Sequence, residues 1–231
     1  MTITDDGSID TGGTDDVDID DDVDEEIDER PRFEWTWPKV IAVVLAFSFL
    51  AASAGYLVTK RTTEAQPNAV DVGFLQDMID HHDQAVTMAM DVIGRQSDPT
   101  TQSFAREVVI YQRWEIGVMD TLLAGWGDSR GDVARTAMAW MGMPSPVGAM
   151  PGMQSADAIQ QLSTLTGKDL DKAFFTMMRD HHLGGVHMAV YASEHAHTKQ
   201  VRELAARIAQ YQEVEANEYT EALKRLGLEN S

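Results

Sequence analysis

The stretches Asp77-Met78-Ile79-Asp80-His81-His82 and Met177-Met178-Arg179-Asp180-His181-His182 lie 100 residues apart in this chain. The same offset relates Phe74, Val86, Met88 and Ala89 to Phe174, Val186, Met188 and Ala189. A later segment also obeys it, since Ala105, Tyr111, Gln112, Glu115, Leu123 and Gly127 recur as Ala205, Tyr211, Gln212, Glu215, Leu223 and Gly227. Two separated segments that share one offset predict an internal duplication in which each repeat is a pair of helices.

Apolar residues recur with a helical period through both repeats, which predicts four long helices over 71–94, 98–126, 169–195 and 198–226. Asp98-Pro99 is a typical helix start, and Gly127 and Gly227 are placed to end helices. No segment has the pattern of a strand. We therefore expect an all-α fold, an antiparallel four-helix bundle of internally duplicated helix pairs.

The charge of the chain is concentrated at its start. Of 231 residues, 38 are acidic and 18 basic, and the first 30 residues hold 14 of the acidic residues against one basic residue. A nucleic-acid partner is excluded because phosphate binding needs a basic face. The absence of cysteine excludes disulfides, thiolate metal sites and iron–sulfur clusters.

Residues 1–37 are predicted to be a disordered acidic tail, either a solvated spacer or a binder of cations or a basic partner. Residues 38–59 are predicted to be a transmembrane helix, because 40–58 carry no charge and Trp35 and Trp37 suit a membrane interface. Ala52-Ser53-Ala54 fits a signal-peptide cleavage site, but the long acidic region before it favours an uncleaved single anchor. Flanking basic residues favour an extracytoplasmic C-terminal domain.

Beyond a linker at 60–69, we expect the bundle to occupy 70–229. It divides into repeat 1 (71–127), a methionine-rich linker (128–168) and repeat 2 (169–227). The linker carries Met138, Met141, Met143, Met150 and Met153. Two short helices are predicted within it, near 131–141 and 155–165.

The chemistry is expected on one inward face of the first helix of each repeat. The candidate metal ligands are Met78, His81, His82, Met88, Met178, His181, His182, His187 and Met188. Imidazole and thioether together favour copper, as Cu(I) or Cu(II), over zinc or iron. Gln112, Glu115, Gln212 and Glu215 could orient the rings from the second helix of each repeat. The alternative is that these residues are core filler and hydrogen-bonded buried histidines.

The two His-His helices, the intervening Met150-Pro151-Gly152-Met153 and the run from Phe174 to His182 resemble the DUF305 family over residues 69–227. The resemblance implies a ferritin-like four-helix bundle, often exported, and copper binding through His and Met in better-known members. These roles would fall on Met78, His81, His82, Met178, His181 and His182. Repeat 2 departs from repeat 1 at Leu183-Gly184-Gly185, where repeat 1 has Asp83-Gln84-Ala85, so the halves need not bind metal equally.

The leading hypothesis is a membrane-anchored copper-binding protein of a cell envelope that sequesters or transfers copper without catalysis. Its partners would be a copper donor or acceptor protein or a membrane complex, and copper affinity would fall below about pH 6 as imidazoles protonate. One alternative is a ferritin-like metal-dependent oxidase, although Met78 and Met178 stand where Glu-x-x-His motifs would need glutamate. Another is a non-catalytic accessory subunit of a membrane complex. The sequence leaves the oligomeric state open.

Overall fold

The computed structural model describes residues 35–63 and 65–229, which are mostly helical. Its helices are α1 (Trp37–Thr63), α2 (Ala69–Val92), α3 (Pro99–Gly125), α4 (Ala156–Leu162), α5 (Gly167–His195) and α6 (Lys199–Arg225). Two 3-10 turns, η1 (Ala139–Met141) and η2 (Val147–Ala149), and two short strands, β1 (Thr136–Ala137) and β2 (Ser145–Pro146), lie between α3 and α4. The strands pair antiparallel, a small departure from the predicted all-α fold. All but the last three residues of the predicted acidic tail lie outside the described residues.

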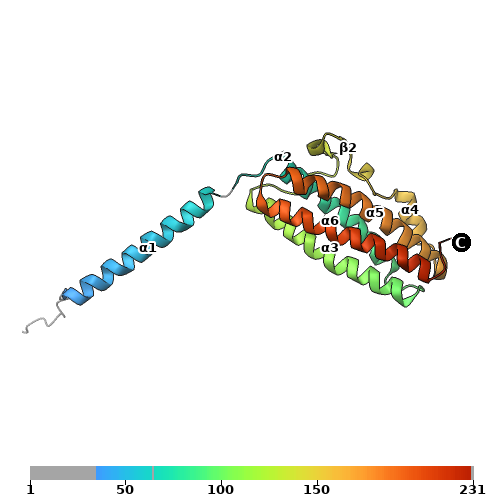
Figure 1. The fold of residues 1–231 in the computed structure, drawn as a ribbon, viewed down its shortest axis with the longest axis horizontal. Helices are drawn as coiled ribbons and strands as arrows, with labels where there is room; N and C mark the ends of the chain where they lie inside the picture. The colour runs from blue at the N-terminus through green and yellow to red at the C-terminus, as the bar shows by residue number, and fades with distance from the viewer. Residues whose placement is uncertain (1–34, 64, 230–231) are drawn as a thin grey trace, which may run out of the picture. The chain divides into compact units, whose positions relative to one another are not determined.

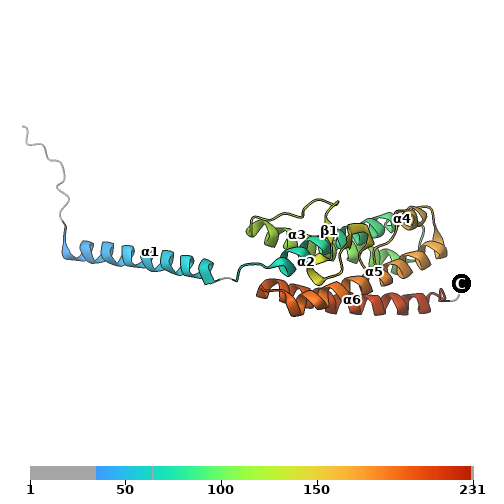
Figure 2. The same cartoon turned by 90° about the horizontal axis from the view of Figure 1, so that it is seen from above.

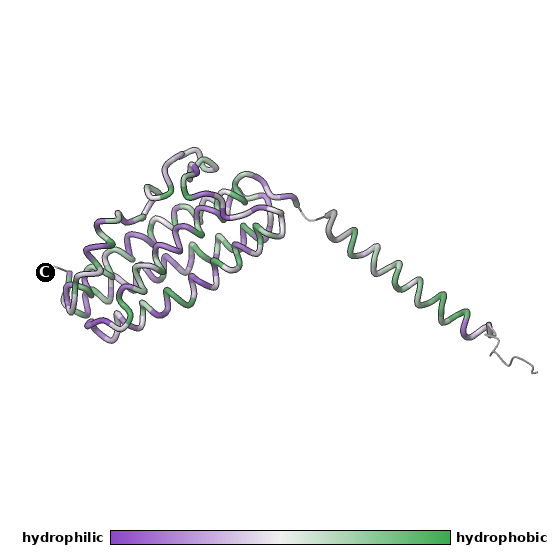
Figure 3. The backbone as a smooth tube through the Cα atoms, turned by 180° about the vertical axis from the view of Figure 1, so that it is seen from behind, coloured by the Kyte–Doolittle hydropathy of each residue, from purple (hydrophilic) through white to green (hydrophobic). Residues whose placement is uncertain are grey.

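The chain divides into two compact units, and the boundary falls between Tyr56 and Leu57. The first contains most of α1, whose stretch Trp37–Val58 has a mean hydropathy of 2.2 over 22 residues, none of them buried. Figure 3 shows this helix as largely hydrophobic along its length. A helix of that length spans about 33 Å, enough to cross the hydrocarbon core of a bilayer.

Local sequence signals fix the starts of the long helices. Asn68 caps α2 by accepting hydrogen bonds from the backbone N–H groups of Val70 and Asp71, and the Asp71 carboxylate accepts one from the N–H of Asn68 in return. Asp98 caps α3 with Pro99 in the first turn, as the sequence predicted. The helices α2, α3, α5 and α6 begin and end within two residues of the predicted bounds, whereas α1 ends four residues after its predicted end.

The four long helices of the second unit pack as two pairs, α2 with α3 and α5 with α6, joined along α2 and α5 (Figures 1 and 2). Two apolar clusters fill the interior. One contains Phe74, Met78, Met119, Met188 and Val201, and the other contains Met88, Val108, Phe174, Met178 and Tyr219. Each cluster therefore joins the start of one repeat's first helix to the end of the other's. The histidine pairs lie between the clusters.

The linker follows one side of the helices (Figure 1). Its predicted helix near 155–165 is confirmed as α4, but the one near 131–141 is wrong. Asp132 accepts a hydrogen bond from the N–H of Ala134 at 2.8 Å, and Met138 and Gly142 adopt positive φ angles of 61° and 75°. These turn conformations interrupt a helix, so the segment forms β1 and η1 instead.

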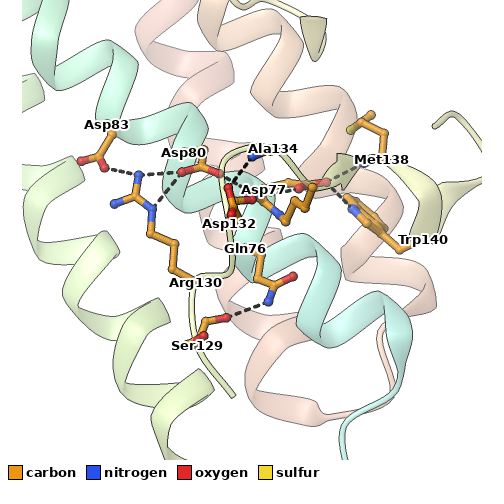
Figure 4. A network of polar contacts seen from close by, with 11 residues as sticks. Gln76, Asp77, Asp80, Asp83, Ser129, Arg130, Asp132, Ala134, Met138 and Trp140 are labelled. Carbon is orange, nitrogen blue, oxygen red and sulfur yellow. Dashed lines mark hydrogen bonds and ion pairs between the residues drawn. The ribbon is translucent and has the colours of Figure 1, made fainter. Parts of the chain in front are cut away.

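An ion-pair network attaches this segment to α2 (Figure 4). Arg135 donates to Asp77 Oδ1 at 2.6 Å and to Asp80 Oδ2 at 2.5 Å, and Arg130 donates to Asp80 Oδ1 at 2.6 Å. Arg130 also pairs with Asp83. The Asp77 and Asp80 side chains are almost fully buried, so the arginines are needed to compensate the negative charge of these carboxylates.

Asp77 also binds the segment that follows Arg135. Its Oδ2 accepts hydrogen bonds from the N–H of Met138 and from Trp140 Nε1, both at 2.7 Å. Among the described residues, Met138 is the only one other than glycine with a positive φ, and its side chain is buried. The Asp77 carboxylate therefore stabilises a backbone conformation that a methionine seldom adopts.

Two further buried carboxylates connect the repeats. Asp71, at the start of α2, accepts hydrogen bonds from the N–H groups of His197 and Thr198 and from the Thr198 hydroxyl. Asp171, one repeat later, accepts one from the N–H of Asp98 at 2.9 Å. Each first helix thus binds the start of the other repeat's second helix. Burial alone would raise the pKa of Asp71, but hydrogen bonds from Thr198, Asn68 and His197 outweigh it and lower the pKa.

We predict that Asp71→Ala lowers the free energy of unfolding by about 2 kcal/mol at pH 7, because several hydrogen bonds to a buried carboxylate are lost. The folded-state pKa is lowered, so this contribution is present above the ordinary carboxyl value and is lost as pH falls through the folded-state pKa. Denaturant unfolding at pH 7 and below pH 4 measures it. Asp120→Ala, at an exposed position of α3, is the control; an equal loss there would contradict the assignment.

Candidate functional site

The centre of the helical unit is a layer of four fully buried histidines. His81 and His82 come from α2 and His181 and His182 from α5, and each has 0 % exposure. They sit where the two helices pack against each other, because each His-His pair occupies the inward face that the helical period predicted. Burying four imidazoles is costly unless their nitrogens have partners, so their contacts define what the layer can do.

The second histidine of each pair is held by a glutamate of the following helix. His82 Nε2 lies 2.7 Å from Glu115 Oε2, and His182 Nε2 lies 3.0 Å from Glu215 Oε2. In the neutral ring, Nε2–H donates to the carboxylate and the Nδ1 lone pair remains. Nδ1 of both His82 and His182 is buried and has no hydrogen-bond partner within residues 35–63 and 65–229. This confirms the predicted contacts of Glu115 and Glu215 with the histidine face.

The first histidines of the two pairs stack on each other. The rings of His81 and His181 have centroids 3.7 Å apart and planes 28° apart. His81 Nε2 lies 3.1 Å from the Pro151 carbonyl oxygen, and its Nδ1 has no partner. His181 Nδ1 lies 3.2 Å from the Gly152 oxygen, and its Nε2 lies 3.0 Å from the His81 oxygen. A neutral imidazole has one N–H, so His181 donates to only one of them.

Burial keeps this stacked pair neutral. It lowers the pKa of His81 to about 3, and the nearby His82 ring acts in the same direction against the Pro151 carbonyl. Burial and the His81 ring lower the pKa of His181 well below its ordinary value. The prediction of protonation near pH 6 is therefore wrong for these two rings, because desolvation disfavours the imidazolium.

The linker closes the layer on one side. Gly152 has a φ of 81°, and a Cβ there would lie 2.5 Å from the His181 carbonyl oxygen. A Cβ on Gly184 would overlap the Pro151 backbone, so the glycine lets the linker lie directly on α5. Gln84 of α2 exchanges two hydrogen bonds with the backbone of Gln154. The divergence between repeats at Gln84 and Gly184 thus follows from where the linker lies.

The structure brings together most of the predicted ligands, but not all. Met78, Met88, Met178 and Met188 are fully buried in the two apolar clusters that flank the histidines. His187 is exposed on α5 and does not face the layer, so its inclusion was wrong. Successive residues turn by about 100°, which moves residue 187 off the buried face that carries Met188.

Gln112 and Gln212 are buried beside the layer with 3 % and 2 % exposure. Neither amide has a hydrogen-bond partner among the described residues. A Cβ on Gly185 would overlap Gln212 Oε1 and lie 3.1 Å from His81 Cε1. Gly185 therefore makes room for the Gln212 amide and the His81 ring. Neither Gln112 nor Gln212 donates the hydrogen bond to a histidine ring that was predicted for it.

The donor set fits a soft ion. Within residues 35–63 and 65–229, no three His, Asp or Glu side chains are grouped closely enough to hold an ion by themselves. Nδ1 atoms of His81, His82 and His182, which are buried without partners among the described residues, could serve as nitrogen donors, and the buried methionines of the flanking clusters could serve as thioether donors. Imidazole that a carboxylate orients from its other nitrogen is the usual arrangement of a metal-binding histidine.

The profile of the family described as "Domain of unknown function (DUF305)" matches residues 71–223. The chain belongs to the DUF305 family. A DUF305 protein of Streptomyces coelicolor has a crystal structure with 32 % sequence identity and a TM-score of 0.62, covering 68 % of this chain and 94 % of that chain. A DUF305 fragment from Deinococcus radiodurans has 28 % identity and a TM-score of 0.61, covering 70 % and 99 %.

CopM in its Cu(II)-bound form is similar at 26 % identity with a TM-score of 0.52, covering 68 % of this DUF305 chain and 97 % of CopM. The uncharacterized protein L153 of Acanthamoeba polyphaga mimivirus is 36 % identical over 53 residues, which are 23 % of this chain and 35 % of that protein. The match thus spans about a third of the length of this curated relative.

Sequence reasoning missed several residues that shape the site of this DUF305 chain. Asp71 and Asp171 obey the 100-residue offset, so the duplication could have indicated their paired role. Asp77 and its partner Arg135 have no equivalents in repeat 2, and Arg130 and Arg135 lie in a segment of low periodicity. No sequence signal connected them to α2.

We predict that Gly152→Ala destabilises the fold by about 2 kcal/mol or more, because an alanine is strained at positive φ and its Cβ overlaps α5. Gly148→Ala in the same linker is the matched control, since a Cβ there meets nothing within 4 Å and φ is not positive. Denaturant unfolding compares the two variants. Equal stability of both would contradict the close approach of linker and α5.

A second prediction concerns pH. Between pH 6.5 and pH 4.5 the unfolded chain gains protons at residues 81 and 181 while the folded chain does not, so the free energy of unfolding falls as pH falls. Each ring contributes up to about 1.4 kcal/mol per pH unit. Denaturant unfolding of the metal-free protein should show a shallower pH slope for His81→Gln. His187→Gln removes an exposed imidazole and should keep the wild-type slope.

Proposed function

We propose that this protein binds copper in the histidine layer and sequesters or transfers it outside the cytoplasm while anchored to a membrane by α1. The observation that carries the proposal is the pair of buried imidazoles, on His82 and His182, whose Nε2 atoms face Glu115 and Glu215 while Nδ1 remains without a partner. A nitrogen lone pair that is buried, oriented and unpaired is costly unless something binds it. A metal ion with borderline or soft character is the ligand that suits it.

Methionine supports copper over other ions. Met78, Met88, Met178 and Met188 lie within about three turns of the histidines on the same two helices, and all are fully buried. Thioether sulfur selects Cu(I) and is a poor ligand for the hard ions that prefer carboxylate oxygen. CopM, which shares the fold at 26 % identity, crystallised in a Cu(II)-bound form. Both oxidation states of copper remain within the proposal.

Two observations support the proposed location, the apolar helix α1 and the description of a DUF305 relative. The stretch Trp37–Val58 is long and apolar enough to cross a membrane, and the Streptomyces coelicolor DUF305 protein is named as a secreted one. An anchored domain outside the cytoplasm accords with both. We further propose that the two helix pairs form an antiparallel four-helix bundle of ferritin-like type, since their packing along α2 and α5 buries one continuous layer of histidines.

Binding without catalysis is favoured over the oxidase alternative. A ferritin-like oxidase uses glutamates and Glu-x-x-His motifs around two metals. Here Met78 and Met178 occupy the positions three before His81 and His181, and the glutamates are hydrogen-bonded to histidines. Oxygen consumption that depends on added iron would reverse this ranking. An accessory subunit with purely structural histidines would retain no metal.

We predict that full-length protein, purified in detergent, retains copper against a competing chelator and that the double variant His82→Ala, His182→Ala does not. His187→Ala, which removes an exposed imidazole from α5, is the matched control and should bind like the wild type. Elemental analysis and chelator titration, with Cu(II) in air and Cu(I) under reductant, measure the stoichiometry and affinity. Circular dichroism verifies that the variants remain helical. No copper in the wild type, or undiminished binding in the double variant, would refute the proposal.

The glutamates give a finer measurement. Glu115→Gln keeps the size of the side chain but weakens its hydrogen bond to His82, so copper affinity should fall about 10- to 100-fold. Glu213→Gln removes the same charge at an exposed position of α6 and should leave the affinity unchanged. Equal effects of the two substitutions would mean that general surface charge, and not ring orientation, controls binding.

A further inference from the structure

A groove of about 750 Å³ lies between α3 and α6, and none of the candidate metal ligands lines it. Its walls carry Ile110, Tyr111 and Trp114 from α3 and Tyr211 and Val214 from α6. Each of these side chains is at least half exposed, although all are apolar or aromatic. A gathering of exposed aromatic side chains around a cavity of ligand size indicates a binding site.

The polar groups of the groove are mostly acidic. Glu115, Glu215 and Glu218 line it against a single guanidinium, Arg207. Glu115 and Glu215 use Oε2 to hold the histidines, and Oε1 of each has no hydrogen-bond partner among the described residues. Carboxylates disfavour an anionic ligand, and aromatic faces attract cations.

The base of the groove provides an independent observation. Gln112 and Gln212 line this base, and their exposure is only 3 % and 2 %. Neither the oxygen nor the nitrogen of either side-chain amide has a hydrogen-bond partner among the described residues. Unpaired amides at a buried position need a ligand that can hydrogen-bond with them. An ammonium N–H donates to an amide oxygen, whereas a quaternary ammonium has no such donor.

The groove is also elongated. A second cavity of about 540 Å³ shares Val214 and Glu218 with it and extends along α6 to Glu221 and Arg225. A ligand that fits must therefore present positive charges with N–H donors, separated by apolar segments that can lie against Ile110 and Val214. A second copy of this chain suits the groove poorly, because acidic residues still outnumber basic ones outside the first 30 residues and like charges repel.

We propose that the α3–α6 groove binds a linear aliphatic polyamine. Its ammonium groups lie against the carboxylates and the faces of Tyr111, Trp114 and Tyr211, its methylene segments contact the apolar side chains, and one N–H group donates to the buried glutamine amides. This site contains no proposed copper ligand, although Glu115 and Glu215 both line it and hold the histidines, and its ligand enters and leaves without any metal.

Isothermal titration calorimetry of full-length, metal-free protein in detergent tests the proposal with spermidine as the probe. We expect saturable, submillimolar binding of spermidine and at least tenfold weaker binding of choline, which is a quaternary ammonium. Trp114→Ala and Glu218→Gln should each weaken spermidine binding about five- to tenfold. Both side chains are exposed, so neither substitution disturbs the core.

Two matched controls separate this site from general attraction to an acidic surface. Glu213→Gln removes the same charge from α6 outside the groove, and Leu183→Ala removes an exposed apolar side chain from α5; both should bind spermidine like the wild type. Equal weakening by Glu213→Gln and Glu218→Gln, or no binding of spermidine, would overturn the proposal. So would a dimer in sedimentation velocity that Trp114→Ala dissociates, because a second copy would then occupy the groove. The copper measurements stand apart from each of these outcomes.

Discussion

The structure depends on satisfying imidazoles that are buried where α2 and α5 pack together. Each histidine pair lies on the inward face of a long helix, so its nitrogens cannot reach water and must find partners within the protein. Glu115 and Glu215 supply carboxylates from α3 and α6, and the carbonyl oxygens of Pro151 and Gly152 supply acceptors from the linker. The positions of α2, α3, α5, α6 and the linker are therefore coupled to the same four rings.

This coupling leaves the interior nearly symmetric and the surface asymmetric. His82 and His182 make equivalent contacts, and so do the capping carboxylates Asp71 and Asp171. The linker can cover only one side, however, and there the repeats differ. Asp80 is buried in ion pairs with linker arginines, whereas Asp180 is half exposed and pairs with its neighbour Arg179. The two repeats therefore share their histidine–glutamate contacts and differ in whether the linker covers them.

The two sides of the histidine layer consequently differ in access. The linker closes one side, where Gly152 and Gly184 allow backbone to lie against backbone. The other side faces the groove between α3 and α6, where the glutamates that hold the histidines also line the wall. Glu115 and Glu215 thus contact the buried rings through one oxygen and the groove through their other face. A metal layer and an organic-cation groove would share these two carboxylates without sharing a ligand.

The sequence by itself determined the four long helices of the second unit, the inward face that carries both histidine pairs and the apolar span of α1, because helical period is a local property of the chain. It also placed four of the predicted methionines in the interior. The tertiary structure decided that His82 pairs with Glu115 and His182 with Glu215. Only the tertiary structure decided that His187 faces solvent, that Arg130 and Arg135 reach Asp77 and Asp80, and that the linker turns instead of forming a helix at 131–141. The arginine contacts join residues 50 and 58 positions apart in the chain, and such contacts leave no periodic trace in the sequence. The helical period indicated that His81 faces inward, but only the packed structure showed that it is fully buried and that this burial lowers its pKa.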